Sequence, residues 1–189
     1  MLDLIEKKFK LRKFLDIFTI KINPNIITIL ALIAAVIAGY LFYEQYVLFA
    51  GLFVLLNGFL DILDGQIAKK FGTSKLGDFL DHTFDRLADV AIFSGIALSG
   101  IISKELGFIT LIFILLVSYL GTQAQAITNK RLYSGILGRA DRLVILVIIS
   151  ILYLFYNLSI YYGILLILIF SIITFLQRFF LCYHAIKSS

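Results

Sequence analysis

Long apolar segments divide this chain, and they limit its fold more than any other feature. Hydrophobic residues make up 61% of the 189 residues. A helix needs about 20 apolar residues to cross the ~30 Å hydrocarbon core of a membrane. Backbone groups in lipid must be satisfied internally, so helices are expected rather than open strands. The sequence therefore predicts an all-α integral membrane bundle of six transmembrane helices, at residues 25–43, 46–69, 78–100, 106–128, 141–157 and 160–182.

The first 22 residues mix basic and apolar side chains, several of them at helical spacing. This pattern favours an amphipathic juxtamembrane helix on the membrane surface, and a solvated basic arm is the alternative. No cleavable signal peptide is recognisable. Asn23-Pro24-Asn25 marks a break before the first span. No long linker follows, so residues 1–189 are expected to form one domain, with six transmembrane helices over 25–183.

The distribution of cations predicts how the bundle lies in the membrane. Of the 17 Lys and Arg residues, only Lys104 falls in a loop on the opposite side from the others. The positive-inside rule then places both termini and the loops at 69–77 and 129–141 in the cytoplasm. The expected location is the cytoplasmic membrane, with several spans and with the 69–77 loop on the cytoplasmic face.

Six of the 12 acidic residues lie within residues 57–89, next to that loop. A carboxylate inside a membrane segment is costly and indicates a functional site. Asp61 and Asp64 are spaced i, i+3, and Asp81 and Asp85 are spaced i, i+4, so each pair shares a helix face. Two antiparallel helices joined by a short loop would present four carboxylates to one point. Oxygen ligands suit Mg²⁺, Mn²⁺ or Ca²⁺, and a two-metal cluster suits phosphoryl chemistry.

The other polar residues of this stretch have simpler interpretations. Asp78 is placed to favour the dipole at a helix start. Asp89 is expected to pair with Arg86 or another cation. His82 is interpreted as structural, because hard divalent metals prefer oxygen.

The spacing of this stretch resembles the signature of the CDP-alcohol phosphatidyltransferase family. Lys69 stands where the family usually has Arg, and its distance to Gly77 is one residue shorter than is common. Lys keeps the charge but loses bidentate geometry. The matching positions are Asp61, Asp64, Gly65, Ala68, Lys69, Gly77, Asp81 and Asp85.

The resemblance implies a reaction in which an alcohol hydroxyl attacks the lipid-side phosphorus of a CDP-linked lipid and CMP leaves. It implies Mg²⁺ or Mn²⁺, in a two-metal site, bound by Asp61, Asp64, Asp81 and Asp85. Asp85 would bind metal, act as the catalytic general base, or do both. The implied nucleotide-binding residues are Asn25, Thr28, Asp61, Asp64, Gly65, Ala68, Lys69 and Gly77. For Asn25 and Thr28 an ordinary helix start is the alternative interpretation.

The acceptor is expected to bind after the fourth span. There Ser118-Tyr119 and the later arginines resemble the inositol-phosphate-using branch of the family, whereas Gly121 and Gln123 stand where that branch has cations. Inositol phosphate, glycerol phosphate and a non-phosphorylated head-group alcohol all stay open as acceptors. The alternative is that these cations only reflect the positive-inside rule. The candidate acceptor-binding residues are Gln123, Lys130, Arg131, Arg139 and Arg142.

Several partners follow from the same resemblance. Archaeal members are most similar, which implies CDP-archaeol rather than CDP-diacylglycerol as the lipid donor. Membrane lipids are expected around the bundle, and no nucleic acid. The family also implies a homodimer, for which Gly95, Ala97 and Gly100 would allow close helix contact.

A small ion transporter or channel that uses the acidic cluster is the competing class. Transporters usually bind near the membrane midplane, whereas these acids are expected near one face. No inverted half is visible in the sequence. A structural scaffold would not explain four carboxylates in an apolar bundle.

Overall fold

The computed structural model describes residues 23–72, 74–128 and 135–187. Within these ranges the chain is helical and contains no strand, which confirms the all-α prediction. The predicted surface helix at residues 1–22 lies outside the described residues, as do Lys130 and Arg131. The helices are α3 (Pro24–Tyr43), α4 (Val47–Phe71), α5 (Lys75–Leu98), α6 (Lys104–Thr128), α7 (Arg139–Leu152) and α8 (Ser159–Lys187).

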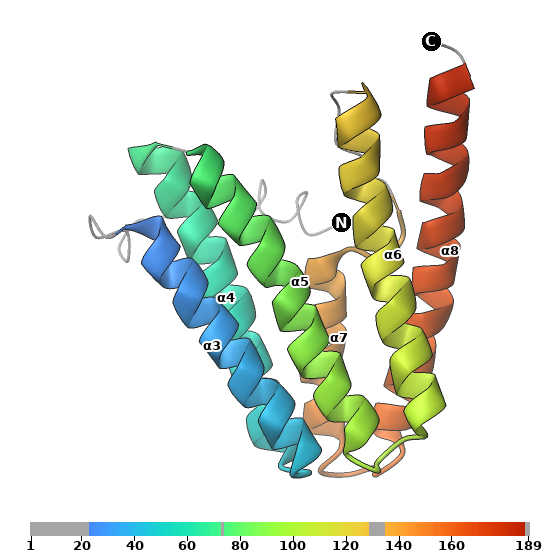
Figure 1. Ribbon diagram of the computed structural model, residues 1–189. Coiled ribbons are helices and arrows are strands. Elements are labelled where there is room, and N and C mark those ends of the chain that lie inside the picture. The colour runs from blue at the N-terminus through green and yellow to red at the C-terminus, as the bar shows by residue number, and fades with distance from the viewer. Residues whose placement is uncertain (1–22, 73, 129–134, 188–189) are drawn as a thin grey trace.

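The helices run alternately up and down, so that one end of the bundle collects the start of α3, the α4–α5 connection and the ends of α6 and α8 (Figure 1). Helix α3 packs against α4 and α5, α6 packs against α5 and α8, and α7 packs against α4 and α8. The two helices that carry six of the 12 acidic residues, α4 and α5, are therefore joined directly, at a single end of the bundle.

Local signals explain where these helices begin and end near the site. The Asn23 side chain accepts a hydrogen bond from the Asn25 amide at 3.0 Å, which caps α3. The Ser74 hydroxyl accepts from the Gly77 amide at 2.9 Å and caps α5. Gly72 follows α4 with φ of +116°, a conformation that favours glycine. Three residues thus suffice to reverse the chain between α4 and α5.

Small residues bring α5 close to its neighbours. A Cβ at Gly95 would overlap the carbonyl oxygen of Gly39 on α3, and a Cβ at Gly107 on α6 would overlap Ala97. These close approaches lie within one chain. The prediction that Gly95 and Ala97 serve contact between two copies is therefore wrong, since the neighbouring helices of the same chain already cover them. Gly100 follows α5 and lies outside any helix, with φ of +78°.

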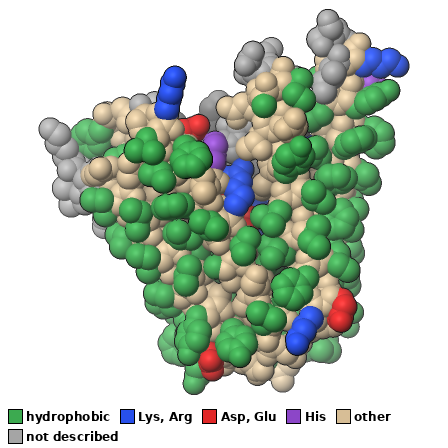
Figure 2. Space-filling view, viewed as in Figure 1, with side chains coloured by type: hydrophobic (Ala, Val, Ile, Leu, Met, Phe, Trp, Pro, Cys, Tyr) green, Lys and Arg blue, Asp and Glu red, His purple; other side chains and the backbone are tan. Residues whose placement is uncertain are grey.

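Four of the described helices, α3, α4, α6 and α8, are long and apolar enough to cross a membrane. Hydrophobic side chains cover most of the visible face, while charged side chains and a histidine gather in a hollow near the upper end (Figure 2). Large apolar side chains remain exposed along the helices, which is the surface that lipid covers. The protein is a multi-pass membrane protein.

The prediction that the fifth membrane-spanning helix covers residues 141–157 is wrong at its C-terminal end. Helix α7 has 14 residues and ends at Leu152, followed by tighter turns in which Leu154 donates to the Ile151 carbonyl at 3.2 Å. At ~1.5 Å per residue the helix is about 21 Å long, short of the ~30 Å hydrocarbon core. The apolar run continues past the helix because apolarity reports contact with lipid or core, not continuous helical hydrogen bonding.

Candidate active site

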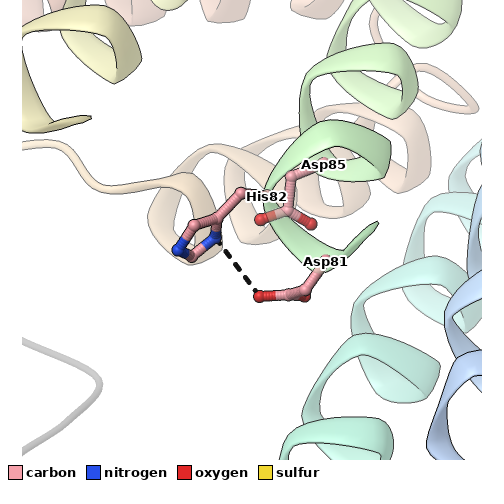
Figure 3. Close-up of side chains that lie close together, drawn as sticks. All are labelled: Asp81, His82 and Asp85. Atoms are coloured by element: carbon pink, nitrogen blue, oxygen red, sulfur yellow. Dashed lines mark ion pairs between the residues drawn. The ribbon is translucent and has the colours of Figure 1, made fainter. Parts of the chain in front are cut away.

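Helices α4 and α5 bring the predicted carboxylates together. The ligand atoms of Asp61, Asp64 and Asp81 lie within 4.8 Å of one another. A second group within the same distance joins Asp81 and Asp85 to His82 (Figure 3). Asp81 belongs to both groups, so the four predicted metal ligands form one continuous cluster. The helical spacing read from the sequence predicted this convergence.

This cluster fits a divalent metal. Asp64 is 5% exposed, and its Oδ2 has no hydrogen-bond partner among the described residues. A buried carboxylate oxygen without a partner is costly, and a bound cation would satisfy it. The donors in Asp61, Asp64, Asp81 and Asp85 are all carboxylate oxygens, which is the set that Mg²⁺ and Mn²⁺ prefer.

His82 lies closer to the metal site than its structural interpretation implied. Its Nδ1 is 3.4 Å from Asp81 Oδ2, drawn as the dashed line in Figure 3, and its Nε2 is 3.3 Å from Asp78 Oδ1. Asp78 has a largely exposed side chain in the first turn of α5, as expected. The imidazole therefore links the helix start to the carboxylate cluster.

A cavity of about 250 Å³ opens beside the carboxylates, between the start of α3 and the α4–α5 turn. A Cβ at Gly65 would meet nothing within 4 Å, so this glycine leaves open space. A Cβ at Gly77 would lie 3.1 Å from the capping hydroxyl of Ser74 and 3.4 Å from Asn25 Oδ1, so Gly77 leaves room for the cap of α5. Of the predicted nucleotide-binding residues, the lining includes Asn25, Thr28, Asp64, Gly65, Ala68, Lys69 and Gly77, but not Asp61.

Arg139, at the start of α7, enters the carboxylate cluster. Its Nη1 is 2.9 Å from Asp61 Oδ1 and 2.8 Å from Asp85 Oδ1. Sequence reasoning assigned Arg139 to the acceptor pocket and did not foresee these ion pairs. The start of α7 is held by the Gly138 amide, which donates to Asp141 Oδ2 at 2.9 Å. The guanidinium is thus fixed against two of the predicted metal ligands.

Arg142 and Asp89 form a buried ion pair between α7 and α5. Arg142 Nη2 lies 2.8 Å from Asp89 Oδ2, and each residue is 2% exposed. The prediction that Asp89 pairs with a cation is confirmed, but the cation is Arg142. Arg86 instead donates to the His82 carbonyl at 2.6 Å and approaches Asp85 at 3.9 Å. Arg142 is buried and paired with Asp89, and its predicted role in acceptor binding stays a prediction.

Asn57 was missed by the sequence analysis. It is fully buried in α4, where its Nδ2 donates to the Ala31 carbonyl at 2.9 Å and its Oδ1 accepts from Arg139 Nη2 at 3.5 Å. Asn57 precedes Asp61 by four residues and so shares its helix face. That spacing was a usable signal. The residue ties α3 and Arg139 to the carboxylate helix.

A second cavity, of about 550 Å³, is lined by Thr122 of α6 together with residues of α5 that include Lys75 and Arg86. Gln123, the neighbour of Thr122, is exposed and lines neither this cavity nor the one beside the carboxylates. Among the described acceptor candidates, the structure therefore brings only Arg139 and Arg142 to the carboxylates or next to them.

Apolar helices, a carboxylate cluster that fits a divalent metal and an adjoining cavity together define a membrane protein with a candidate metal site. The sequence comparison then gives the family. Residues 21–180 match the CDP-alcohol phosphatidyltransferase family, and the chain belongs to it. It is a transferase of phospholipid biosynthesis.

Curated relatives and solved structures agree with this assignment. An archaetidylinositol phosphate synthase of Pyrococcus horikoshii is 40% identical over 158 residues, which cover 83% of this chain and 81% of the relative. A second archaetidylinositol phosphate synthase, from Methanothermobacter thermautotrophicus, is 30% identical over 139 residues, which cover 72% of this chain and 71% of the relative. The crystal structure of Mycobacterium tuberculosis phosphatidylinositol phosphate synthase with CDP-DAG bound has a TM-score of 0.77, with 26% identity over 86% of this chain and 87% of that one. The same enzyme has been solved in complex with manganese and citrate.

Proposed function

We propose that this protein transfers an archaetidyl group from a CDP-linked lipid to inositol phosphate and releases CMP. The observation that carries the proposal is the 40% identity with an archaetidylinositol phosphate synthase over four-fifths of that protein's length. The geometry supports it, because the carboxylate cluster adjoins a cavity lined by seven of the eight predicted nucleotide-binding residues. Glycerol phosphate or a non-phosphorylated head-group alcohol would use the same reaction at the same site.

The residues of the site suggest how the transfer proceeds. The cavity beside Gly65 would hold the cytidine diphosphate moiety, with Lys69 near its phosphates. Asp61, Asp64, Asp81 and Asp85 would hold a pair of Mg²⁺ or Mn²⁺ ions, which supply charge neutralisation for the diphosphate when bound. Asp85 accepts the proton of the acceptor hydroxyl as its oxygen bonds to the lipid-side phosphorus. The bond from that phosphorus to the CMP oxygen breaks, and CMP leaves.

The full topology belongs to the same proposal. Helix α5, and α7 together with the turns that follow it up to residue 158, would complete six membrane segments, with α5 carrying its acids towards the bundle interior. The positive-inside pattern supports a cytoplasmic position for both termini and for the α4–α5 end of the bundle. Residues 1–189 would form one domain, with residues 1–22 on the membrane surface. A homodimer stays a prediction of the family resemblance.

The test is CMP release from purified protein in lipid nanodiscs. CDP-archaeol and CDP-diacylglycerol are supplied as donors with Mg²⁺ or Mn²⁺, against inositol 1-phosphate, glycerol phosphate, inositol and serine as acceptors. We expect the fastest release with CDP-archaeol and inositol 1-phosphate, and the loss of release in Asp64→Ala and Asp85→Asn. Glu105→Gln, an exposed acid at the opposite end of the bundle, is the matched control and should keep activity. Faster release with another acceptor would contradict the substrate assignment, and ion transport without CMP release would contradict the enzyme.

A further inference from the structure

The position of Arg139 raises a question of charge that the proposed reaction leaves open. A single guanidinium nitrogen, Nη1, lies 2.9 Å from Asp61 Oδ1 on α4 and 2.8 Å from Asp85 Oδ1 on α5. Asp61 belongs to the group with Asp64 and Asp81, and Asp85 belongs to the group with Asp81 and His82. Arg139 is 17% exposed in its side chain, so water screens these contacts weakly. The guanidinium therefore already serves as the cation between the two helices.

A divalent metal on the same carboxylates would lie next to this guanidinium. Like charges repel strongly where water is largely excluded, so the site cannot keep both cations in contact with Asp61 and Asp85 without a large cost. Charge balance points the same way. The positive charge of two divalent ions would equal the negative charge of the four clustered carboxylates, and the charge of Asp89 is already balanced by Arg142. Among the described residues, Arg139 would then keep only two longer contacts, from Nε to Asp89 Oδ1 at 3.7 Å and from Nη2 to Asn57 Oδ1 at 3.5 Å.

We propose that Arg139 is a tethered competitor of the metals, and that divalent metal binding displaces its guanidinium from Asp61 and Asp85. Before metal binds, Arg139 offsets part of the cluster's negative charge and holds α7 against α4 and α5. Once metal binds, the released cation is available for an anionic group of the substrate, a consequence that rests on the proposed function. Arg139 is thus a positioning residue that couples metal occupancy to anion binding.

The test compares Arg139→Gln and Arg139→Lys with the wild-type protein in nanodiscs. Mn²⁺ affinity is measured from the electron paramagnetic resonance signal of free Mn²⁺, and the thermal unfolding midpoint is measured in EDTA and in Mn²⁺. We expect Arg139→Gln to bind Mn²⁺ about tenfold more tightly, because the competing cation is gone. Its midpoint in EDTA should fall, and Mn²⁺ should raise that midpoint by more than in the wild-type protein.

Arg139→Lys keeps the charge and should fall between the other two proteins in Mn²⁺ affinity, which keeps the test decisive should Arg139→Gln not fold. Lys70→Gln removes an exposed cation from the same end of the bundle and should leave Mn²⁺ affinity unchanged. Weaker or unchanged Mn²⁺ binding in the Arg139 variants would overturn the proposal, because the arginine would then support the metal ligands or be irrelevant to them. Neither readout depends on CMP release, so failure of the proposed reaction and failure of this competition give different results.

Discussion

The buried pair of Arg142 and Asp89 gives a sharp prediction about what holds α7 to α5. Arg142→Met removes the guanidinium and leaves a carboxylate that is 2% exposed. At 2.8 Å and an effective dielectric constant of about 20, the gross attraction in this pair is about 6 kcal/mol, part of which offsets the cost of burying both charges. Loss of one partner from such a pair typically costs about 3–5 kcal/mol. Arg139 Nε remains 3.7 Å from the other oxygen of Asp89, so we expect the lower end, about 3 kcal/mol.

The measurement is the free energy of unfolding in mixed dodecylmaltoside and dodecyl sulfate micelles. The double variant Asp89→Asn with Arg142→Met removes both charges and should be more stable than Arg142→Met alone. Together with Asp89→Asn alone it completes a double-mutant cycle, for which we expect a coupling energy of about 2–3 kcal/mol. Lys104→Met, an exposed cation at the opposite end, is the control and should change stability by less than about 0.5 kcal/mol. Additive effects of the two substitutions, or a single-variant cost similar to the control, would refute the reasoning.

Three further substitutions test packing and backbone hydrogen bonds. Gly95→Ala should destabilise the fold by about 1–3 kcal/mol in the same assay, because its Cβ overlaps the Gly39 carbonyl. Gly65→Ala makes the same change where space is open, so it should increase the free energy of unfolding by up to about 1 kcal/mol. It should also raise the KM for the CDP-linked lipid, because the added methyl enters the cavity. Equal effects of Gly95→Ala and Gly65→Ala on stability would contradict this argument. Thr174→Val should cost about 1–3 kcal/mol, because the buried Leu137 amide loses its acceptor at 3.1 Å, and a stability equal to the wild type would show that the amide finds another partner.

Short-range features of the site were predictable because they depend on helical geometry alone. Spacings of three and four residues place Asp61 with Asp64, and Asp81 with Asp85, on single faces. The turn residues between the two helices permit only a short connection, so the faces meet near that end. The same logic, applied to Asn57 four residues before Asp61, would have found the missing member of this face.

The partners of the cations were not predictable in the same way. Arg139 and Arg142 lie on α7, fifty or more residues beyond the acids that they contact. Their charge and their position at or next to the 129–141 loop fit the positive-inside rule equally well, and that rule says nothing about contacts. Which acid each arginine meets depends on how α7 packs between α4 and α8, and that depends on the shapes of all the interior side chains.

The sequence by itself determined the membrane character, the helical class and the cluster of four carboxylates, because apolar length and helical periodicity are local properties of the chain. The tertiary structure alone decided that α7 is short, that Gly95 serves contacts within the chain, and that Arg139 lies among the predicted metal ligands while Arg142 is buried against Asp89. These outcomes depend on packing between segments distant in sequence, where the cost of burying each charge selects its partner.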